Sequence, residues 1–117
     1  MSKKIIIIED DPDILDVMSC ILANEGYEVI SSVDPKPLDD VQVIQPMLIL
    51  MDNRLKGTFG ADFCRQFKTD PATSNYPVAI VSATPSLDRV AADSLADDYL
   101  PKPFDIEELV ALVKKYE

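Results

Sequence analysis

Short apolar runs alternate along this chain with segments in which apolar residues recur every three or four positions. The runs predict five β-strands, at residues 4–8, 27–32, 47–51, 77–82 and 97–100. Within them, the stretches IIII, MLILM and PVAIV are apolar at every residue. Because a strand covered on one face alternates apolar and polar residues, uninterrupted runs favour parallel strands covered on both faces.

Helical spacing fills most of the gaps between these strands. Helices are predicted after Asp11-Pro12, between Ala61 and Phe67, after Pro85 and after Asp105. An aspartate before a proline suits a helix cap and first turn, and Asp105 with Glu108 three residues later suits a capping box. Pro35 and Pro37 limit any helix before the third strand to about residues 38–45, so a short or distorted element is expected there.

This alternation of strands and helices predicts one architecture. Right-handed crossovers between parallel strands build an open α/β sheet with helices on both faces. The 117 residues fit a single domain, residues 1–117, without a linker or repeat, so no separate output domain is expected. Ligands of such sheets bind at the carboxyl ends of the strands, near the point where the strand order reverses.

Composition narrows the function classes. The net charge of −10 argues against direct binding of nucleic acid. The sequence lacks an apolar run long enough for a membrane span and the features of a signal peptide, so a cytoplasmic protein without membrane contact is expected. The absence of histidine, with only Cys20 and Cys64 far apart, excludes a Ser-His-Asp triad and a zinc site.

Polar residues that could take part in binding or catalysis lie at the ends of the apolar strands. Glu9, Asp10 and Asp11 follow the first strand and Asp52 follows the third. Ser82 ends the fourth strand, and Lys102 follows the fifth. Carboxylates so close repel one another unless a positive group lies among them, and a cation, a lysine and plain solvent are the candidates. Asp11 and Asp13 suit a solvated helix N-terminus, but the other acids and the lysine predict one shared pocket.

The stretches that carry these residues resemble the response regulator receiver domain, the CheY-like phosphoacceptor domain of bacterial two-component systems. The resemblance runs from about Lys4 to Tyr116 and is carried by IIIIEDDPDIL, LILMDNRLKGTFG, TFGADFCRQFKTDPATSNYPVAIVSA and DDYLPKPF. It implies a flavodoxin-like (βα)5 fold, doubly wound around a five-stranded parallel sheet of order 2-1-3-4-5.

The resemblance also implies a role for each strand-end residue. Asp52 would be the phosphoacceptor, Lys102 would contact the phosphoryl oxygens, and Ser82 and Tyr99 would be the switch residues. Mg²⁺, which prefers carboxylate and other oxygen ligands, would bind to Glu9, Asp10, Asp52 and the backbone carbonyl of Arg54. A cis peptide bond is implied between Lys102 and Pro103, where proline makes that conformation accessible.

By the same resemblance, the chain accepts a phosphoryl group from a phosphohistidine on a histidine kinase or phosphotransfer protein. Phosphorylation would then change contacts with a downstream protein target, with homodimer formation on activation as one form of such a contact. The chain would not be an enzyme beyond catalysing its own phosphorylation and dephosphorylation.

Three alternatives share parts of this pattern. The main one is a receiver-like interaction module that is never phosphorylated, although all the acceptor residues are present here. A Mg²⁺-dependent phosphohydrolase is disfavoured because 117 residues leave no cap domain, and a flavin carrier because acids occupy the place of its phosphate-binding loop. Ser82 and Tyr99 also suit plainer roles, as a strand-end cap and a half-buried aromatic side chain.

The sequence departs from the family pattern at a few positions. Lys56 stands where proline is usual, which would loosen the loop beside Asp52, and Met47 stands where aspartate is usual. Leu95 occupies a usual glycine position, and the stretch between Ser82 and Lys102 is slightly short. These changes put the standard switch and dimer geometry in question and leave the phosphorylation chemistry in place.

Overall fold

The strands and helices follow one another in the order that the hydrophobic pattern predicts. The computed structural model of the chain describes residues 3–55 and 57–117, and the expectation for Lys56 lies outside these residues. The strands are β1 (Lys4–Ile8), β2 (Glu28–Ser32), β3 (Leu48–Met51), β4 (Arg54–Leu55), β5 (Thr58–Phe59), β6 (Val78–Ser82) and β7 (Asp98–Pro101). The helices are α1 (Pro12–Asn24), η1 (Lys36–Asp40), α2 (Val41–Ile44), α3 (Gly60–Thr69), α4 (Leu87–Asp93) and α5 (Ile106–Lys114).

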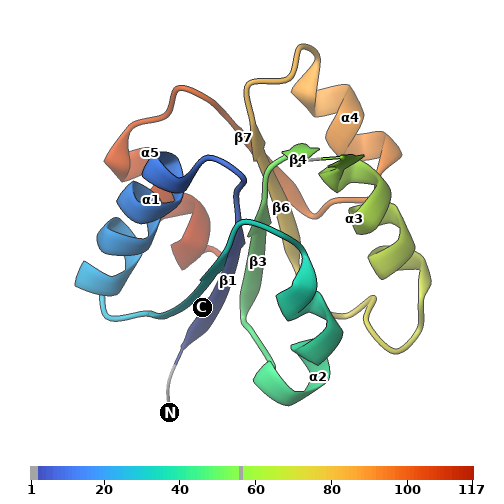
Figure 1. Cartoon of the computed structure of the whole chain (residues 1–117), viewed down its shortest axis with the longest axis horizontal. Helices are drawn as coiled ribbons and strands as arrows, with labels where there is room; N and C mark the ends of the chain where they lie inside the picture. The colour runs from blue at the N-terminus through green and yellow to red at the C-terminus, as the bar shows by residue number, and fades with distance from the viewer. Residues whose placement is uncertain (1–2, 56) are drawn as a thin grey trace.

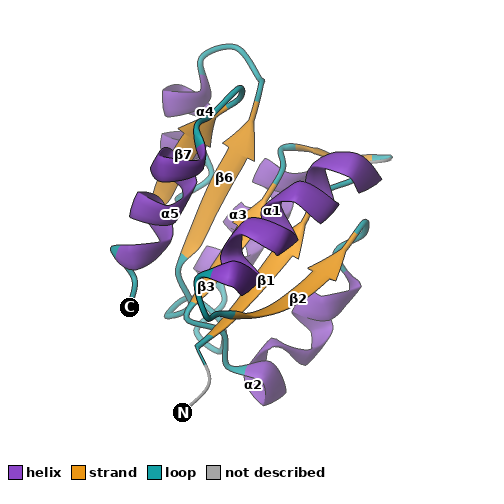
Figure 2. Ribbon diagram, turned by 90° about the vertical axis from the view of Figure 1, so that its left-hand side faces the viewer, coloured by secondary structure: helices purple, strands orange, loops and turns teal. Residues whose placement is uncertain are grey.

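Five of the strands form one parallel sheet in the order β2-β1-β3-β6-β7 (Figure 2). Since β6 and β7 are the fourth and fifth strands of this sheet, the expected order 2-1-3-4-5 is confirmed. The chain leaves β1 for β2 on one side and then crosses to β3 on the other. The strand order therefore reverses between β1 and β3, and the crevice expected of such a fold lies at their carboxyl ends.

Helices cover both faces of the sheet. The helices α1 and α5 lie on one face, and α2, α3 and α4 lie on the other (Figure 1). Successive isoleucines of β1 alternate between the two cores: Ile5 and Ile7 pack on the α1–α5 side, and Ile6 and Ile8 pack on the other side. All four are at most 1% exposed. Burial on both faces thus explains why this strand is apolar at every position.

Capping residues begin two helices where the sequence predicts them. Asp11 Oδ1 accepts hydrogen bonds from the backbone N–H groups of Asp13 at 2.9 Å and Ile14 at 3.3 Å, so Asp11 is the N-cap of α1. At α5, the Asp105 backbone N–H donates to Glu108 Oε1 at 2.9 Å, as in a capping box. Within the described ranges 3–55 and 57–117, no helix combines the length and the apolar character needed to cross a membrane.

The element between β2 and β3 is short and irregular, as the two prolines predict. A 3₁₀-helix, η1, leads into the single turn of α2, which ends at Gln45 in the left-handed conformation with φ of 54°. Left-handed backbone also occurs on both sides of α4, at Ser86 with φ of 55° and Leu95 with φ of 64°. The glycine that the family usually has at the position of Leu95 would adopt this conformation without strain.

The segment that follows Asp52 contains a small antiparallel hairpin that the sequence analysis does not predict. It pairs β4 with β5, with Arg54 opposite Phe59 and Leu55 opposite Thr58. The hairpin delivers the chain directly into α3, whose first residue is Gly60. It therefore connects the end of β3 to the N-terminus of α3.

Candidate functional site

Two strand ends bring three carboxylates together. Glu9 follows β1 and Asp52 follows β3, and the Asp52 backbone N–H donates to the Ile8 carbonyl oxygen at 3.0 Å. This bond extends the parallel ladder by one residue and fixes Asp52 beside Glu9. Glu9, Asp10 and Asp52 each offer one carboxylate oxygen, and these oxygens all lie within 4.8 Å of one another. Such a group of oxygen ligands can hold a metal ion.

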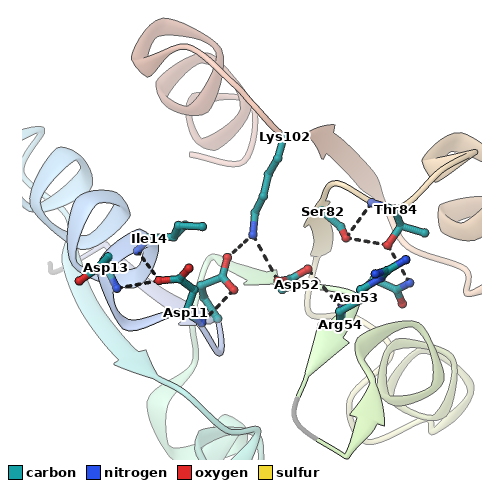
Figure 3. A network of polar contacts seen from close by, with 10 residues as sticks. Asp11, Asp13, Ile14, Asp52, Asn53, Arg54, Ser82, Thr84 and Lys102 are labelled. Carbon is teal, nitrogen blue, oxygen red and sulfur yellow. Dashed lines mark hydrogen bonds and ion pairs between the residues drawn. The ribbon is translucent and has the colours of Figure 1, made fainter.

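A lysine lies against two of the three acids. Lys102 comes from the loop that follows β7, and its Nζ pairs with Glu9 Oε1 and lies 3.2 Å from Asp52 Oδ2 (Figure 3). Its side chain is 14% exposed, and those of Glu9 and Asp52 are 2% and 9% exposed. The Lys102–Pro103 peptide bond is cis, as the resemblance implies. The predicted shared pocket therefore contains a positive group between the buried carboxylates.

Burial and the neighbouring groups shift the pKa values of the two buried acids, Glu9 and Asp52, in opposite directions. Burial raises the pKa of Glu9 to about 7, and the adjacent Asp52 adds to this rise against the opposing effect of Lys102. Burial also acts to raise the pKa of Asp52, but the hydrogen bond with Glu9 and the charge of Lys102 outweigh it and lower that pKa. Asp52 therefore keeps its ionised form, the state a nucleophilic carboxylate needs, to a lower pH than Glu9 does.

Ser82 and Arg54 are hydrogen-bonded to residues of this cluster, and Tyr99 is exposed at the surface. The Ser82 carbonyl oxygen accepts the backbone N–H of Lys102 at 3.0 Å, so the end of β6 positions the lysine loop. The Arg54 backbone N–H donates to Asp52 Oδ1 at 3.3 Å. Tyr99 is 42% exposed, so it lies at the surface with part of the residue covered. The individual roles of these residues stay predictions.

The structure adds residues that the sequence analysis does not single out. A β-carbon on Gly60 would lie 3.0 Å from the carbonyl carbon of Asp52 and closer still to its oxygen, so only glycine lets α3 approach the end of β3 this closely. The buried side chain of Asn53 accepts the backbone N–H of Ala61 at 3.0 Å and donates to Thr84 Oγ1 at 3.2 Å. Of these residues, Gly60 is the one that the sequence could have indicated, because it is a glycine at the start of the predicted helix.

Fold and site together define a flavodoxin-like α/β protein with a cluster of acids and a largely covered lysine at the switch point of the sheet. Residues 5–114 match the family described as the response regulator receiver domain, and the chain belongs to this family. It is a receiver domain of the kind found in two-component response regulators. Receiver domains are not classical enzymes, and they interact with histidine kinases.

Individual relatives support the same family. The chain is 40% identical over 114 residues to the DNA-binding dual master transcriptional regulator RpaA of Synechocystis sp., covering 95% of this chain and 47% of the relative. A crystal structure of a putative response regulator from Chloroflexus aurantiacus superposes with a TM-score of 0.89, 26% identity and coverage of 99% and 98% of the two chains.

A third relative is the receiver domain of the sensor histidine kinase PA1611 from Pseudomonas aeruginosa, solved with a magnesium ion coordinated in the active-site cleft. It has a TM-score of 0.87, 24% identity and coverage of 99% and 98% of the two chains, and this likeness concerns the fold. The chain spans about half the length of the curated relatives it matches, 47% and 50% for two of them. The expectations of a single domain and of a cytoplasmic location stay predictions.

Proposed function

We propose that Asp52 accepts a phosphoryl group from a phosphohistidine on a histidine kinase or phosphotransfer protein. The observation that carries the proposal is the buried Asp52 carboxylate, which lies 3.2 Å from Lys102 Nζ and has carboxylate oxygens of Glu9 and Asp10 within 4.8 Å. A buried carboxylate that lies beside a lysine and within a group of acids able to hold a cation suits phosphoryl transfer better than a purely structural role.

In the transfer, an Asp52 carboxylate oxygen attacks the phosphorus while the P–N bond to the donor histidine breaks. The result is a mixed anhydride on Asp52 and a free imidazole on the partner. Lys102 Nζ faces the incoming phosphoryl oxygens and compensates part of their charge. Water later cleaves the anhydride in the same crevice, so the chain catalyses its own phosphorylation and dephosphorylation and no reaction of another substrate.

The three acids fit Mg²⁺, because this ion prefers a shell of oxygen ligands made of carboxylates, waters and phosphate oxygens. Glu9, Asp10 and Asp52 would hold it together with the Arg54 carbonyl, and it would stabilise the charge on the transferring phosphoryl group. The magnesium in the active-site cleft of the Pseudomonas aeruginosa receiver supports this assignment. Among the described residues, Lys102 is the one cation that forms ion pairs with this cluster of three carboxylates, so a bound Mg²⁺ would compensate the remaining negative charge.

The phosphoryl group brings about two negative charges to the end of β3. Ser82 would donate a hydrogen bond to it, and Tyr99, which is exposed in this structure, would move inward behind Ser82. The altered surface would then change contacts with a downstream protein target or with a second copy of the chain. With a net charge of −10, this domain itself is expected not to contact nucleic acid, even though RpaA is described as DNA-binding.

The test is to incubate the protein with Mg²⁺ and acetyl phosphate and to measure its intact mass. A gain of one phosphoryl group is expected for the wild type and for Asp39→Asn, which removes a carboxylate on η1 away from the crevice. Asp52→Asn should show no gain. A wild type that gains no phosphoryl group would support the alternative, an interaction module that is not phosphorylated.

A further inference from the structure

A chain of side-chain hydrogen bonds leads from the residue beside Asp52 to Ser82 (Figure 3). Asn53 Nδ2 donates to Thr84 Oγ1 at 3.2 Å, and Thr84 Oγ1 lies 2.8 Å from Ser82 Oγ. The Thr84 backbone N–H also donates to Ser82 Oγ, at 3.2 Å. Asn53 and Ser82 are 6% and 1% exposed, so bulk water does not compete with the hydrogen bonds at either end of the chain.

The direction of the first hydrogen bond follows from the neighbour on the other side of Asn53. The backbone N–H of Ala61, at the start of α3, points at the Asn53 carboxamide with a distance of 3.0 Å. An N–H group requires an acceptor, so the carboxamide oxygen must face Ala61 and the NH₂ group must face Thr84. Asn53 is therefore the donor, and Thr84 Oγ1 keeps its own hydrogen for a further bond.

The direction of the second hydrogen bond follows from the hydrogens available in the phosphorylated state. A hydroxyl group has one hydrogen and two acceptor lone pairs. If Ser82 donates its hydrogen to a phosphoryl oxygen, the Thr84 hydroxyl has to be the donor in the Thr84–Ser82 pair. The two donors of Thr84 then occupy both lone pairs of Ser82 Oγ. Every hydrogen in the chain points toward the phosphoryl group, and each bond polarises the next.

We propose that Thr84 and Asn53 are positioning residues that orient the Ser82 hydroxyl as a hydrogen-bond donor toward the phosphoryl group on Asp52. Neither residue touches that group, because Thr84 acts through Ser82 and Asn53 acts through Thr84. Asn53 also joins Asp52 directly in sequence, so the same side chain links the acceptor, the start of α3 and the Ser82 loop. This inference rests on the proposed function and adds two residues to it.

The test uses BeF₃⁻, a tetrahedral analogue of the phosphoryl group that bonds to an aspartate oxygen. Its affinity is measured by fluorine NMR at saturating Mg²⁺ for the wild type, Thr84→Val and Thr84→Ser. Valine has nearly the shape of threonine without the hydroxyl, so Thr84→Val should weaken BeF₃⁻ binding roughly three- to tenfold, the effect of one hydrogen bond. Thr84→Ser should bind like the wild type, and Mg²⁺ affinity without BeF₃⁻ should be the same in all three.

A double-mutant cycle separates a positioning role from a structural one. In the Ser82→Ala background, Thr84→Val should cause little further loss, because the hydroxyl that it orients is already gone. The inference is overturned if Thr84→Val binds BeF₃⁻ as tightly as the wild type, or if it causes the same loss in both backgrounds. A wild type that does not bind BeF₃⁻ at all overturns the proposed function itself. If Thr84→Val does not fold, Thr84→Ala replaces it in the cycle.

Discussion

Replacing Glu9 by glutamine should stabilise the metal-free protein above neutral pH. The Glu9 carboxylate is 2% exposed, and burial with the nearby Asp52 raises its pKa from 4.5 to about 7 despite the ion pair with Lys102. A tenfold change in proton affinity corresponds to about 1.4 kcal/mol, so the ionised form of Glu9 costs the folded protein on the order of 3 kcal/mol. Glutamine keeps the shape and removes the charge.

The sign of the effect follows from proton binding in the two states. Between pH 4.5 and 7 the folded protein retains a proton on Glu9 that the unfolded chain has lost. Stability from this group is therefore complete below pH 4.5 and is lost as the pH rises through 7. The pKa of Asp52 is lowered from 3.8 and that of Lys102 is raised from 10.5, so these two groups act outside this window.

The measurement is urea unfolding, followed by circular dichroism in EDTA, from pH 5 to pH 8.5. The free energy of unfolding of the wild type should fall by roughly 2–3 kcal/mol across this range relative to Glu9→Gln. Glu28→Gln, which removes an exposed carboxylate on β2, should follow the wild type. Added Mg²⁺ should restore the wild type at pH 8.5 by binding the folded state alone. Parallel curves for the wild type and Glu9→Gln would refute the reasoning.

Three further substitutions test other contacts. Gly60→Ala places a β-carbon against the Asp52 carbonyl group; it should cost at least about 2 kcal/mol in urea unfolding and reduce labelling by acetyl phosphate, and unchanged labelling would contradict the close approach. Leu95→Gly relieves a φ of 64° and should stabilise by roughly 0.5–1 kcal/mol, a prediction that fails if the urea midpoint falls. Lys68→Met removes an ammonium 2.7 Å from the Ser74 carbonyl and 2.8 Å from Asp97 Oδ2; it should cost about 1–3 kcal/mol, and a neutral effect would show that solvent replaces these bonds.

The three central strands of the sheet, β1, β3 and β6, could be predicted because burial on both faces requires nearly uninterrupted apolar runs. The edge strands β2 and β7 are less buried, and their prediction depends on the alternation of strands and helices. A run such as LILM admits one interpretation when glycine, proline or charge bounds it. The β4–β5 hairpin could not be predicted, since two residues per strand carry no periodicity. Its conformation depends on how α3 docks against β3, a tertiary contact that no local pattern in the sequence encodes.

The residues of the site divide in the same way. Glu9, Asp52 and Lys102 could be placed together because parallel strands carry whatever follows them to one edge of the sheet. Asn53 and Thr84 could not be assigned to the site from the sequence, because each acts through hydrogen bonds with residues that only folding brings close. An asparagine after an aspartate and a threonine in a loop are ordinary turn residues in a sequence. The hydrogen bonds of Asn53 with Ala61 and Thr84, seen in the structure, distinguish Asn53 from an ordinary turn residue.

The strand β1 stabilises the fold, and Glu9, the residue that follows it, destabilises the fold when it is ionised. Each isoleucine of β1 is at most 1% exposed, and full burial of such a side chain contributes about 1.5–3 kcal/mol. Two of the four isoleucines therefore offset the roughly 3 kcal/mol that ionised Glu9 costs at high pH. The adjacent apolar run allows the chain to keep a destabilising carboxylate at the strand end, where a cation can bind to it. The stability of β1 and the affinity of the acidic cluster for a cation are thus linked through Glu9.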